Sequence, residues 1–185
     1  NPEAAEGFMA ALLRDLYDTS QDTHADSSYP DALAIGADEF LDITYSFNST
    51  TPLNFLYALM AHYPAIDKED LWSTAINCRF DIDGIAPSTV TNLGSTSHTV
   101  NVASPDGTID LAWTRADDDV AGVDGYGVFV THSPGMPSAV LDIGNVTSWT
   151  TPALAPGTWY FCIRSHDRAG RWGSTYASCG PYVVR

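Results

Sequence analysis

The sequence predicts an α+β protein with two domains, a small all-α bundle in residues 1–80 followed by an antiparallel β-sandwich in residues 84–185. Three observations predict this architecture. Apolar residues recur with helical spacing over the first part and alternate with polar residues over the second. Residues 1–83 carry 15 acidic and three basic side chains, whereas residues 84–185 carry eight and five. A short segment containing glycine and proline, residues 81–87, separates the two parts.

The first two helices are predicted from their apolar stripes. In the first helix, Glu3 and Glu6 lie in the first turn, where the helix dipole favours negative charge. Its stripe follows helical periodicity and consists of Phe8, Met9, Leu12, Leu13, Leu16 and Tyr17. A polar stretch, residues 18–28, interrupts the pattern, and a second helix is expected over residues 30–46. Its inward-facing residues are Leu33, Ala37, Phe40, Leu41 and Tyr45.

The third and fourth helices are predicted from their capping residues. The third begins with Thr51 as N-cap and Pro52 at the first helical position, and Pro64 stops it. The fourth begins with Asp67 as N-cap and runs to about Cys78. The inward-facing residues of the two helices are Phe55, Leu56, Leu59, Met60, Tyr63, Leu71, Trp72, Ala75 and Ile76.

The second half contains about seven short segments that read as strands. Clusters of glycine, proline, aspartate and asparagine separate them, as turns do in all-β proteins. Seven short strands with this punctuation are typical of a β-sandwich. The expected strands are residues 90–92, 98–103, 109–115, 125–131, 148–150, 159–165 and 176–184.

The placement of the three cysteines is informative. Cys162 and Cys179 lie on the last two expected strands, and a hairpin pairing them has its centre in the turn-like segment 167–172. We therefore expect a disulfide between Cys162 and Cys179, which would indicate an oxidising compartment. Two buried thiols are the alternative. The remaining Cys78 is either buried or cross-linked to another chain.

Several segments of the second half are distinctive as a set. They are residues 86–93, 97–100, 108–114, 118–126, 157–164, 167–172 and 180–182. Together they resemble a fibronectin-type-III-like module of secreted bacterial proteins, over about residues 84–185. The resemblance implies an extracellular or cell-surface location and a role in adhesion, spacing or binding.

Residues 5–18, the acidic loop after them and residues 37–42 are similar to the C-terminal helical lobe of zinc metallopeptidases of the gluzincin type. Such a lobe follows the zinc-binding helix. This sequence contains no His-Glu-x-x-His, and its five histidines lack the spacing of zinc ligands. The resemblance therefore implies that the zinc helix lies upstream of Asn1. Because the sequence does not begin with methionine, we expect a mature or cut fragment of a longer protein.

Two acidic segments are candidate calcium sites, because alternating oxygens in a flexible loop can surround a hard cation. The candidate ligands are Asp18, Asp22 and Asp26 in the first segment, and Asp117, Asp119 and Asp124 in the second. A solvated surface loop is the alternative for both. Calcium is the cofactor that the sequence suggests, and no catalytic residue is expected.

The tryptophans suggest a possible sugar platform. Trp113 and Trp159 lie on expected strands and are assigned to the core. Trp149 and Trp172 lie nearer to loops, so they either pack on the sandwich or present a ring to a glycan. Motifs for a serine nucleophile, a phosphate loop or a dinucleotide are absent from the sequence.

Charge and hydropathy restrict the partners. The net charge of −15 argues against nucleic acid and anionic membranes, and no apolar run is long enough to insert into a bilayer. The expected partners are another protein, a matrix or glycan component, or a second copy of the chain. The expected function is that of a non-catalytic C-terminal fragment of a secreted or surface protein. The alternatives are a subunit that self-assembles into an extracellular fibre or layer and, less favoured, part of an active zinc metallopeptidase.

Overall fold

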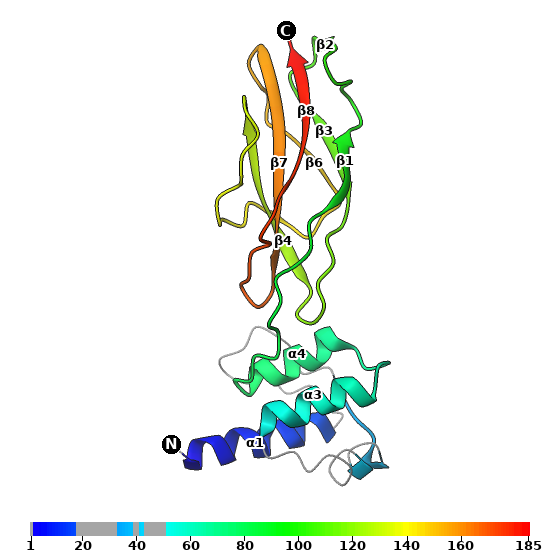
Figure 1. Cartoon of the computed structure of the whole chain (residues 1–185), viewed down its shortest axis with the longest axis vertical. Helices are drawn as coiled ribbons and strands as arrows, with labels where there is room; N and C mark the ends of the chain where they lie inside the picture. Colours follow the sequence, from blue (N-terminus) through cyan, green and yellow to red (C-terminus); the bar gives the residue numbers. More distant parts are fainter. Residues whose placement is uncertain (1, 18–32, 39–40, 43–50) are drawn as a thin grey trace. The chain divides into compact units, whose positions relative to one another are not determined.

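The computed structural model describes residues 2–17, 33–38, 41–42 and 51–185. The chain divides into two compact units, Asn1–Gly84 and Ile85–Arg185, which are described separately (Figure 1). The first unit contains helices and the second contains the two β-sheets. Within the described residues, no helix is long and apolar enough to cross a membrane.

The described helices of the first unit are α1 (Pro2–Tyr17), α3 (Pro52–His62) and α4 (Lys68–Asn77). The predicted caps are confirmed. Thr51 Oγ1 accepts a hydrogen bond from the Asn54 amide at 3.2 Å, and Asp67 Oδ1 accepts from the Glu69 and Asp70 amides at 3.0 and 3.1 Å. Among the described residues, the core of the unit consists of Leu12, Leu16, Ile35, Phe55, Leu56, Leu59, Leu71, Trp72, Ala75, Cys78 and Ile82.

The second predicted helix is only partly correct. Residues 33–36 are not helical, because this segment crosses the end of α1, where the Ile35 amide donates to the Leu16 carbonyl at 2.7 Å. Residues 37–38 and 41–42 are helical, but Leu41 is 51% exposed although the apolar stripe predicted it to face inward. Tyr17, the last member of the stripe of α1, is likewise exposed. The rest of the predicted second helix lies outside the described residues.

The second unit has eight strands in two sheets. Their bounds are β1 (Thr91–Ser95), β2 (Ala103–Ser104), β3 (Asp110–Thr114), β4 (Val123–Thr131), β5 (Ile143–Gly144), β6 (Ser148–Thr150), β7 (Gly157–Asp167) and β8 (Ala177–Val184). A three-stranded sheet has the order β1-β3-β6, and a five-stranded sheet has the order β2-β8-β7-β4-β5. All pairs are antiparallel except β2 with β8.

Both sheets contribute to one core, an arrangement compatible with a β-sandwich (Figure 1). The three-stranded sheet supplies Leu111 and Trp113, and the five-stranded sheet supplies Tyr126, Phe161 and Tyr182. Their inward direction follows from the alternation along β3, β4, β7 and the end of β8.

Two strand predictions differ from the structure. The expected strand at residues 98–103 is mostly a turn, and only Ala103–Ser104 pairs with β8. His98 anchors this turn, because its side chain is buried and its ring nitrogens lie 2.9 Å from Ser97 Oγ and 3.1 Å from the Asp106 carbonyl. The two-residue strand β5 was not predicted, since Ile143–Gly144 is too short to show alternation.

Two glycines of β4 allow another segment to approach the outer face of the five-stranded sheet. A Cβ added to Gly127 would lie 2.9 Å from the Val140 carbonyl oxygen and 3.0 Å from that of Ser138. A Cβ added to Gly125 would lie 2.3 Å from the Ile143 carbonyl oxygen. The connection between β4 and β5 therefore packs directly on Gly127, and the end of this connection and the start of β5 pack on Gly125.

Replacing Gly127 by alanine is expected to destabilise the second unit by about 1–3 kcal/mol, because the new methyl group would push backbone away from the sheet. Urea unfolding followed by tryptophan fluorescence measures the loss. Gly144→Ala is the matched control, since a Cβ there meets nothing within 4 Å, and it should change stability by less than about 0.5 kcal/mol. Equal stability of the two variants would contradict the close approach.

Candidate functional site

The outer face of the five-stranded sheet carries a cluster of charged and aromatic side chains, which we call the ring ladder: Asp124, Arg164, His166 and Trp172. The Trp172 ring lies 4.4 Å from the His166 ring, centroid to centroid, and 5.5 Å from the Arg164 guanidinium carbon. Arg164 Nε donates to the Gly173 carbonyl at 2.7 Å. Asp124 Oδ2 lies 3.2 Å from His166 Nδ1.

A β-bulge brings Asp124 to this face. The pairing of β4 with β7 shifts between Val123, which lies opposite Asp167, and Gly125, which lies opposite His166. A bulge inserts one extra residue and re-aims its side chain. Asp124 is that residue, and its carboxylate reaches the imidazole instead of following the alternation of the strand.

A carboxylate bound to a histidine can orient a general base, and this pairing is the one catalytic arrangement that the ladder resembles. The contacts of His166 indicate a structural role. One ring nitrogen is held by Asp124, and the ring packs on Trp172, which itself lies over Gly127. The ladder therefore fastens the connection between β7 and β8 to the sheet.

A buried aspartate stabilises the turn at residues 167–172 by a hydrogen bond across it. Asp167 is fully buried, and its Oδ1 accepts from the Arg171 amide at 2.7 Å. The Asp167 amide donates to the Arg171 carbonyl, and Gly170 has a φ of +85°, which glycine tolerates best. The predicted turn is thus confirmed, with Asp167 as its organising side chain.

The predicted disulfide is not formed in the structure, where Cys162 and Cys179 are both free. The two strands pair as expected, but Cys162 lies opposite Ser178 and Cys179 lies opposite Phe161. Successive side chains of a strand point to opposite faces, so a shift of one residue separates the two sulfurs. Cys179 packs against the core, whereas Cys162 lies on the outer face beneath the Gly135 amide, which donates to its sulfur at 3.5 Å.

The one-residue shift in the pairing of β7 with β8 arises from a bulge in β8 at Gly180-Pro181. Between Trp159 and Phe161 the partner strand advances by one residue more than β7 does, across Gly180-Pro181. Gly180 has a φ of +111°, and a Cβ there would lie 2.8 Å from the Trp159 carbonyl oxygen. Glycine and proline inside a strand are signals of a bulge, and they could have corrected the predicted register.

The predicted calcium ligands are only partly described. Asp18, Asp22 and Asp26 lie outside the described residues. Asp117 and Asp119 are exposed in one loop, and a carboxylate oxygen of Asp119 lies within 4.8 Å of one of Asp118. Asp124, the third predicted ligand of that segment, is instead paired with His166.

Sequence reasoning missed the role of Asp118 in this loop. Its Oδ2 accepts from the Gly122 amide at 2.8 Å and from the Val120 amide at 3.3 Å. The loop is also tied to Ser88, whose amide donates to the Asp117 carbonyl and whose hydroxyl accepts from the Asp117 amide, both at 2.8 Å. An Asp followed closely by glycine is the signal for such a turn.

The tryptophans are engaged in packing. Trp149 lies 5.7 Å from Phe161, centroid to centroid, on the inner side of the three-stranded sheet. Trp172 is part of the ring ladder, and Trp159 stacks on His132 at 4.0 Å. The two candidate sugar platforms, Trp149 and Trp172, thus pack on other side chains of the sandwich.

In the helical unit, a buried carboxylate meets the remaining cysteine. Asp15 and Cys78 are each 1% exposed, and the Cys78 thiol donates to Asp15 Oδ2 at 3.5 Å. Arg14 Nη2 lies 3.2 Å from the other carboxylate oxygen of Asp15. Of the two alternatives for Cys78, the structure shows the buried one. Asp15 lies three residues after Leu12, so helical spacing alone could have placed it on the buried face.

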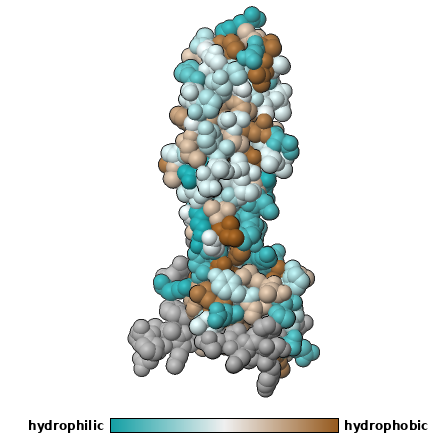
Figure 2. Space-filling view, in the orientation of Figure 1, coloured by the Kyte–Doolittle hydropathy of each residue, from teal (hydrophilic) through white to brown (hydrophobic). Residues whose placement is uncertain are grey.

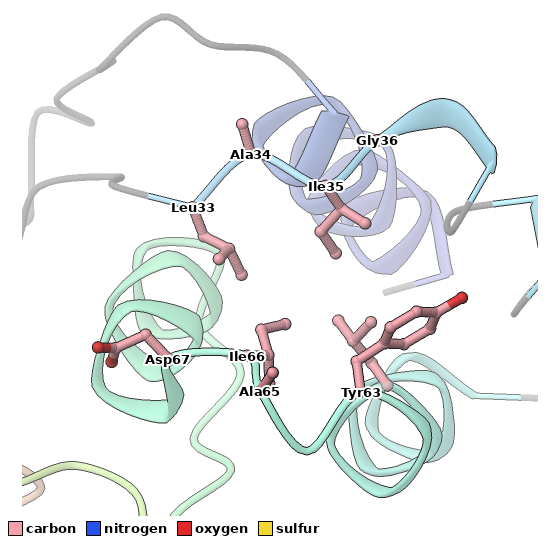
Figure 3. A pocket seen from close by; sticks show the side chains of 9 residues that line it. Leu33, Ala34, Ile35, Gly36, Tyr63, Ala65, Ile66 and Asp67 are labelled. Carbon is pink, nitrogen blue, oxygen red and sulfur yellow. The ribbon is translucent and has the colours of Figure 1, made fainter.

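A pocket of about 290 Å³ opens between the segment at residues 33–36 and the connection from α3 to α4 (Figure 3). Leu33 and Ile35 point toward Ile66 and Tyr63 across it. Asp67, the charged residue of the lining, is used as the N-cap of α4. The pocket offers an apolar surface and few groups with reactive chemistry.

No family model and no curated protein matches this chain. Among solved structures, the chain is similar to the spore cortex lytic enzyme SleM of Clostridium perfringens, with a TM-score of 0.34 and 18% sequence identity. The similarity covers 51% of this chain and 28% of that enzyme, so the chain spans less than a third of the enzyme's length. A likeness at this level assigns neither a fold nor an activity.

Removing the ring at the centre of the ladder is expected to destabilise the second unit. Trp172→Ala should lower the free energy of unfolding by about 1–3 kcal/mol, because it deletes ring contacts with His166 and Arg164. Trp172→Phe keeps an aromatic ring and should lose less than half as much. Urea unfolding monitored by circular dichroism measures both variants, and an alanine variant as stable as the parent protein would refute this role.

The three cysteines should react with a thiol reagent about tenfold or more slowly in the native protein than after denaturation. Burial raises the pKa of Cys162 and of Cys179, and Cys78 is buried, so little reactive thiolate is exposed. Alkylation in denaturant without reductant, followed by mass spectrometry, should modify all three. Finding only one modified cysteine would restore the disulfide between Cys162 and Cys179.

Proposed function

We propose that this chain is a non-catalytic part of a secreted or surface protein, in which the β-sandwich serves as a spacing and attachment module. The observation that carries this proposal is the path of the chain through the second unit. The chain enters the sandwich at one end, and its C-terminus lies at the opposite end (Figure 1). A module with its ends at opposite poles adds its whole length to a polypeptide that passes through it.

The length of the strands supports a spacing role. Strand β7 has 11 residues and at about 3.3 Å per residue spans about 36 Å. Antiparallel hydrogen bonds hold β7 between β4 and β8 along most of this length. The sandwich can therefore hold a fixed separation between whatever lies before and after it.

The sheet topology supports the fibronectin-type-III-like assignment of the module. In constant-type immunoglobulin domains, the sheet that contains the first strand has four strands, and the other sheet has three. Here the strand that follows β4 is β5, and it pairs with β4 within the larger sheet. The first sheet therefore keeps three strands, β1-β3-β6.

The surface of the sandwich suits a solvated extracellular module. Figure 2 shows, on the visible face, apolar side chains in small groups among polar ones. The proposed location rests on this surface, on the net charge of −15 and on the resemblance to secreted modules. The free cysteines do not contribute to it. Calcium binding by the loop of Asp117 and Asp119 remains a proposal, as the extracellular location does.

Self-assembly is the second candidate function, and a specific observation favours it. Phe129, Met136, Val140 and Leu141 are each 44–55% exposed, and all four lie on β4 or on its connection to β5. Exposed apolar groups beside a strand end can promote pairing with another chain.

The proposal predicts that the full chain remains a monomer of 19.9 kDa in sedimentation experiments from micromolar to near-millimolar concentration, with and without calcium. It also predicts no hydrolysis of casein in the presence of zinc. Binding to immobilised collagen, fibrinogen or chitin distinguishes attachment from pure spacing, because only attachment gives saturable binding. Association that grows with concentration would instead support the assembly candidate, and chelator-sensitive proteolysis would support the peptidase.

A further inference from the structure

The outer edge of β4 is only partly covered by its neighbour. Strand β5 pairs with Gly125 and Tyr126, and the following residues of β4 extend beyond it to Thr131. The connection between the two strands lies over the outer face of the sheet, where the Ser138 and Val140 carbonyls approach Gly127. The strand edge from Val128 to Thr131 is therefore not hydrogen-bonded to another strand in the described structure.

The direction of the backbone groups along this edge follows from two hydrogen bonds. The Asp142 amide donates to the Tyr126 carbonyl at 3.0 Å, and Asp142 Oδ2 accepts from the Val128 amide at 2.8 Å. Residues 126 and 128 thus direct their polar groups away from β7. Because these groups alternate along an antiparallel strand, Val130 directs its amide and carbonyl to the same side. Among the residues that the structure describes, the Val130 amide has no hydrogen-bond partner.

We propose that this edge of β4 is a strand-pairing surface for a second copy of this chain, and that the Asp142 side chain blocks it. The carboxylate accepts the hydrogen bond of the Val128 amide, which an incoming strand would need for the hydrogen bonds next to those of Val130. Charged side chains at strand edges are a known protection against edge-to-edge pairing. Asp142 therefore keeps single copies apart.

The edge suits a second copy because it is complementary to itself. A two-fold axis at Val130 lets its amide and carbonyl exchange hydrogen bonds with those of Val130 in the other copy. Within the strand the flanking pair is then Phe129 with Thr131, and Val128 faces His132, the residue that follows the end of β4. These pairs bring β-branched and aromatic side chains together and place no two carboxylates opposite each other. Phe129, 45% exposed, gains cover in this arrangement.

This inference goes beyond the spacing role and is independent of it, since a blocked edge is compatible with a monomeric spacer. It is tested by Asp142→Ala in the full chain at physiological salt. Sedimentation velocity should show the variant associating at a concentration at least about tenfold lower than the parent protein, and approaching twice the mass of 19.9 kDa. Asp142→Asn is the matched control, because its amide oxygen can still accept from Val128, and it should remain monomeric.

A second substitution locates the interface. Val130→Pro removes the free amide of an edge strand without breaking the ladder to β7, so the double variant Asp142→Ala, Val130→Pro should return to the monomer. Asp142→Ala that sediments like the parent protein would overturn the proposal. So would association that persists with Val130→Pro, or an Asp142→Asn variant that associates as strongly as Asp142→Ala.

Amide hydrogen exchange decides the question should the proline variant fail to fold. In the parent protein the Val130 amide should exchange quickly, because it lacks a partner. In Asp142→Ala at high concentration it should become protected by at least about tenfold, while amides of the helical unit keep their rates. An unprotected Val130 amide in an associated sample would place the contact elsewhere and overturn the assignment.

Discussion

Packing between the two sheets through one set of aromatic rings is the interaction on which the second unit depends. Trp113 on the three-stranded sheet contacts Tyr126 edge-to-face at 5.7 Å and stacks on Phe161 at 6.1 Å, both on the five-stranded sheet. Trp149 adds a further contact to Phe161 at 5.7 Å. Large rings supply most of the buried apolar area in a small core, so these contacts fix how the sheets face each other. Because β4 and β7 carry these rings on their inner face, the same packing also positions the ring ladder and the free edge of β4.

Polar side chains complete the core at its margins. The Tyr182 hydroxyl accepts from the Ser95 amide at 2.9 Å and so joins the last strand to the first. Burial raises the pKa of this hydroxyl, so it stays protonated in the core. The Ser165 hydroxyl donates to the Ser88 carbonyl at 2.5 Å, and the Tyr126 hydroxyl accepts from the Ala116 amide at 3.4 Å. Each bond satisfies a buried polar group that would otherwise oppose burial.

Two bulges decide which side chains reach the outer face. The bulge near Val123 turns Asp124 toward His166, and the extra residue near Gly180 moves Cys179 into the core, away from Cys162. A strand pattern of period two assumes an uninterrupted ladder, so it could not place Asp124 or predict the state of the cysteines. A strand pattern also cannot show where side chains bond to the backbone instead. At His98 such hydrogen bonds form a turn in place of the expected strand.

Local patterns were enough to predict the change from helical to alternating periodicity, the caps Thr51 and Asp67, the turn at Asp167 and the core position of Trp113. These features depend on neighbours within a few residues, where side-chain spacing and capping chemistry act directly. The sequence left open the register of β7 with β8, the pairing of Asp124 with His166, the contact of Asp15 with Cys78 and the free edge at Val130, and the folded chain fixes all four. These features depend on residues that lie far apart in the chain. In the sheets, one inserted residue also reverses the face to which a side chain points.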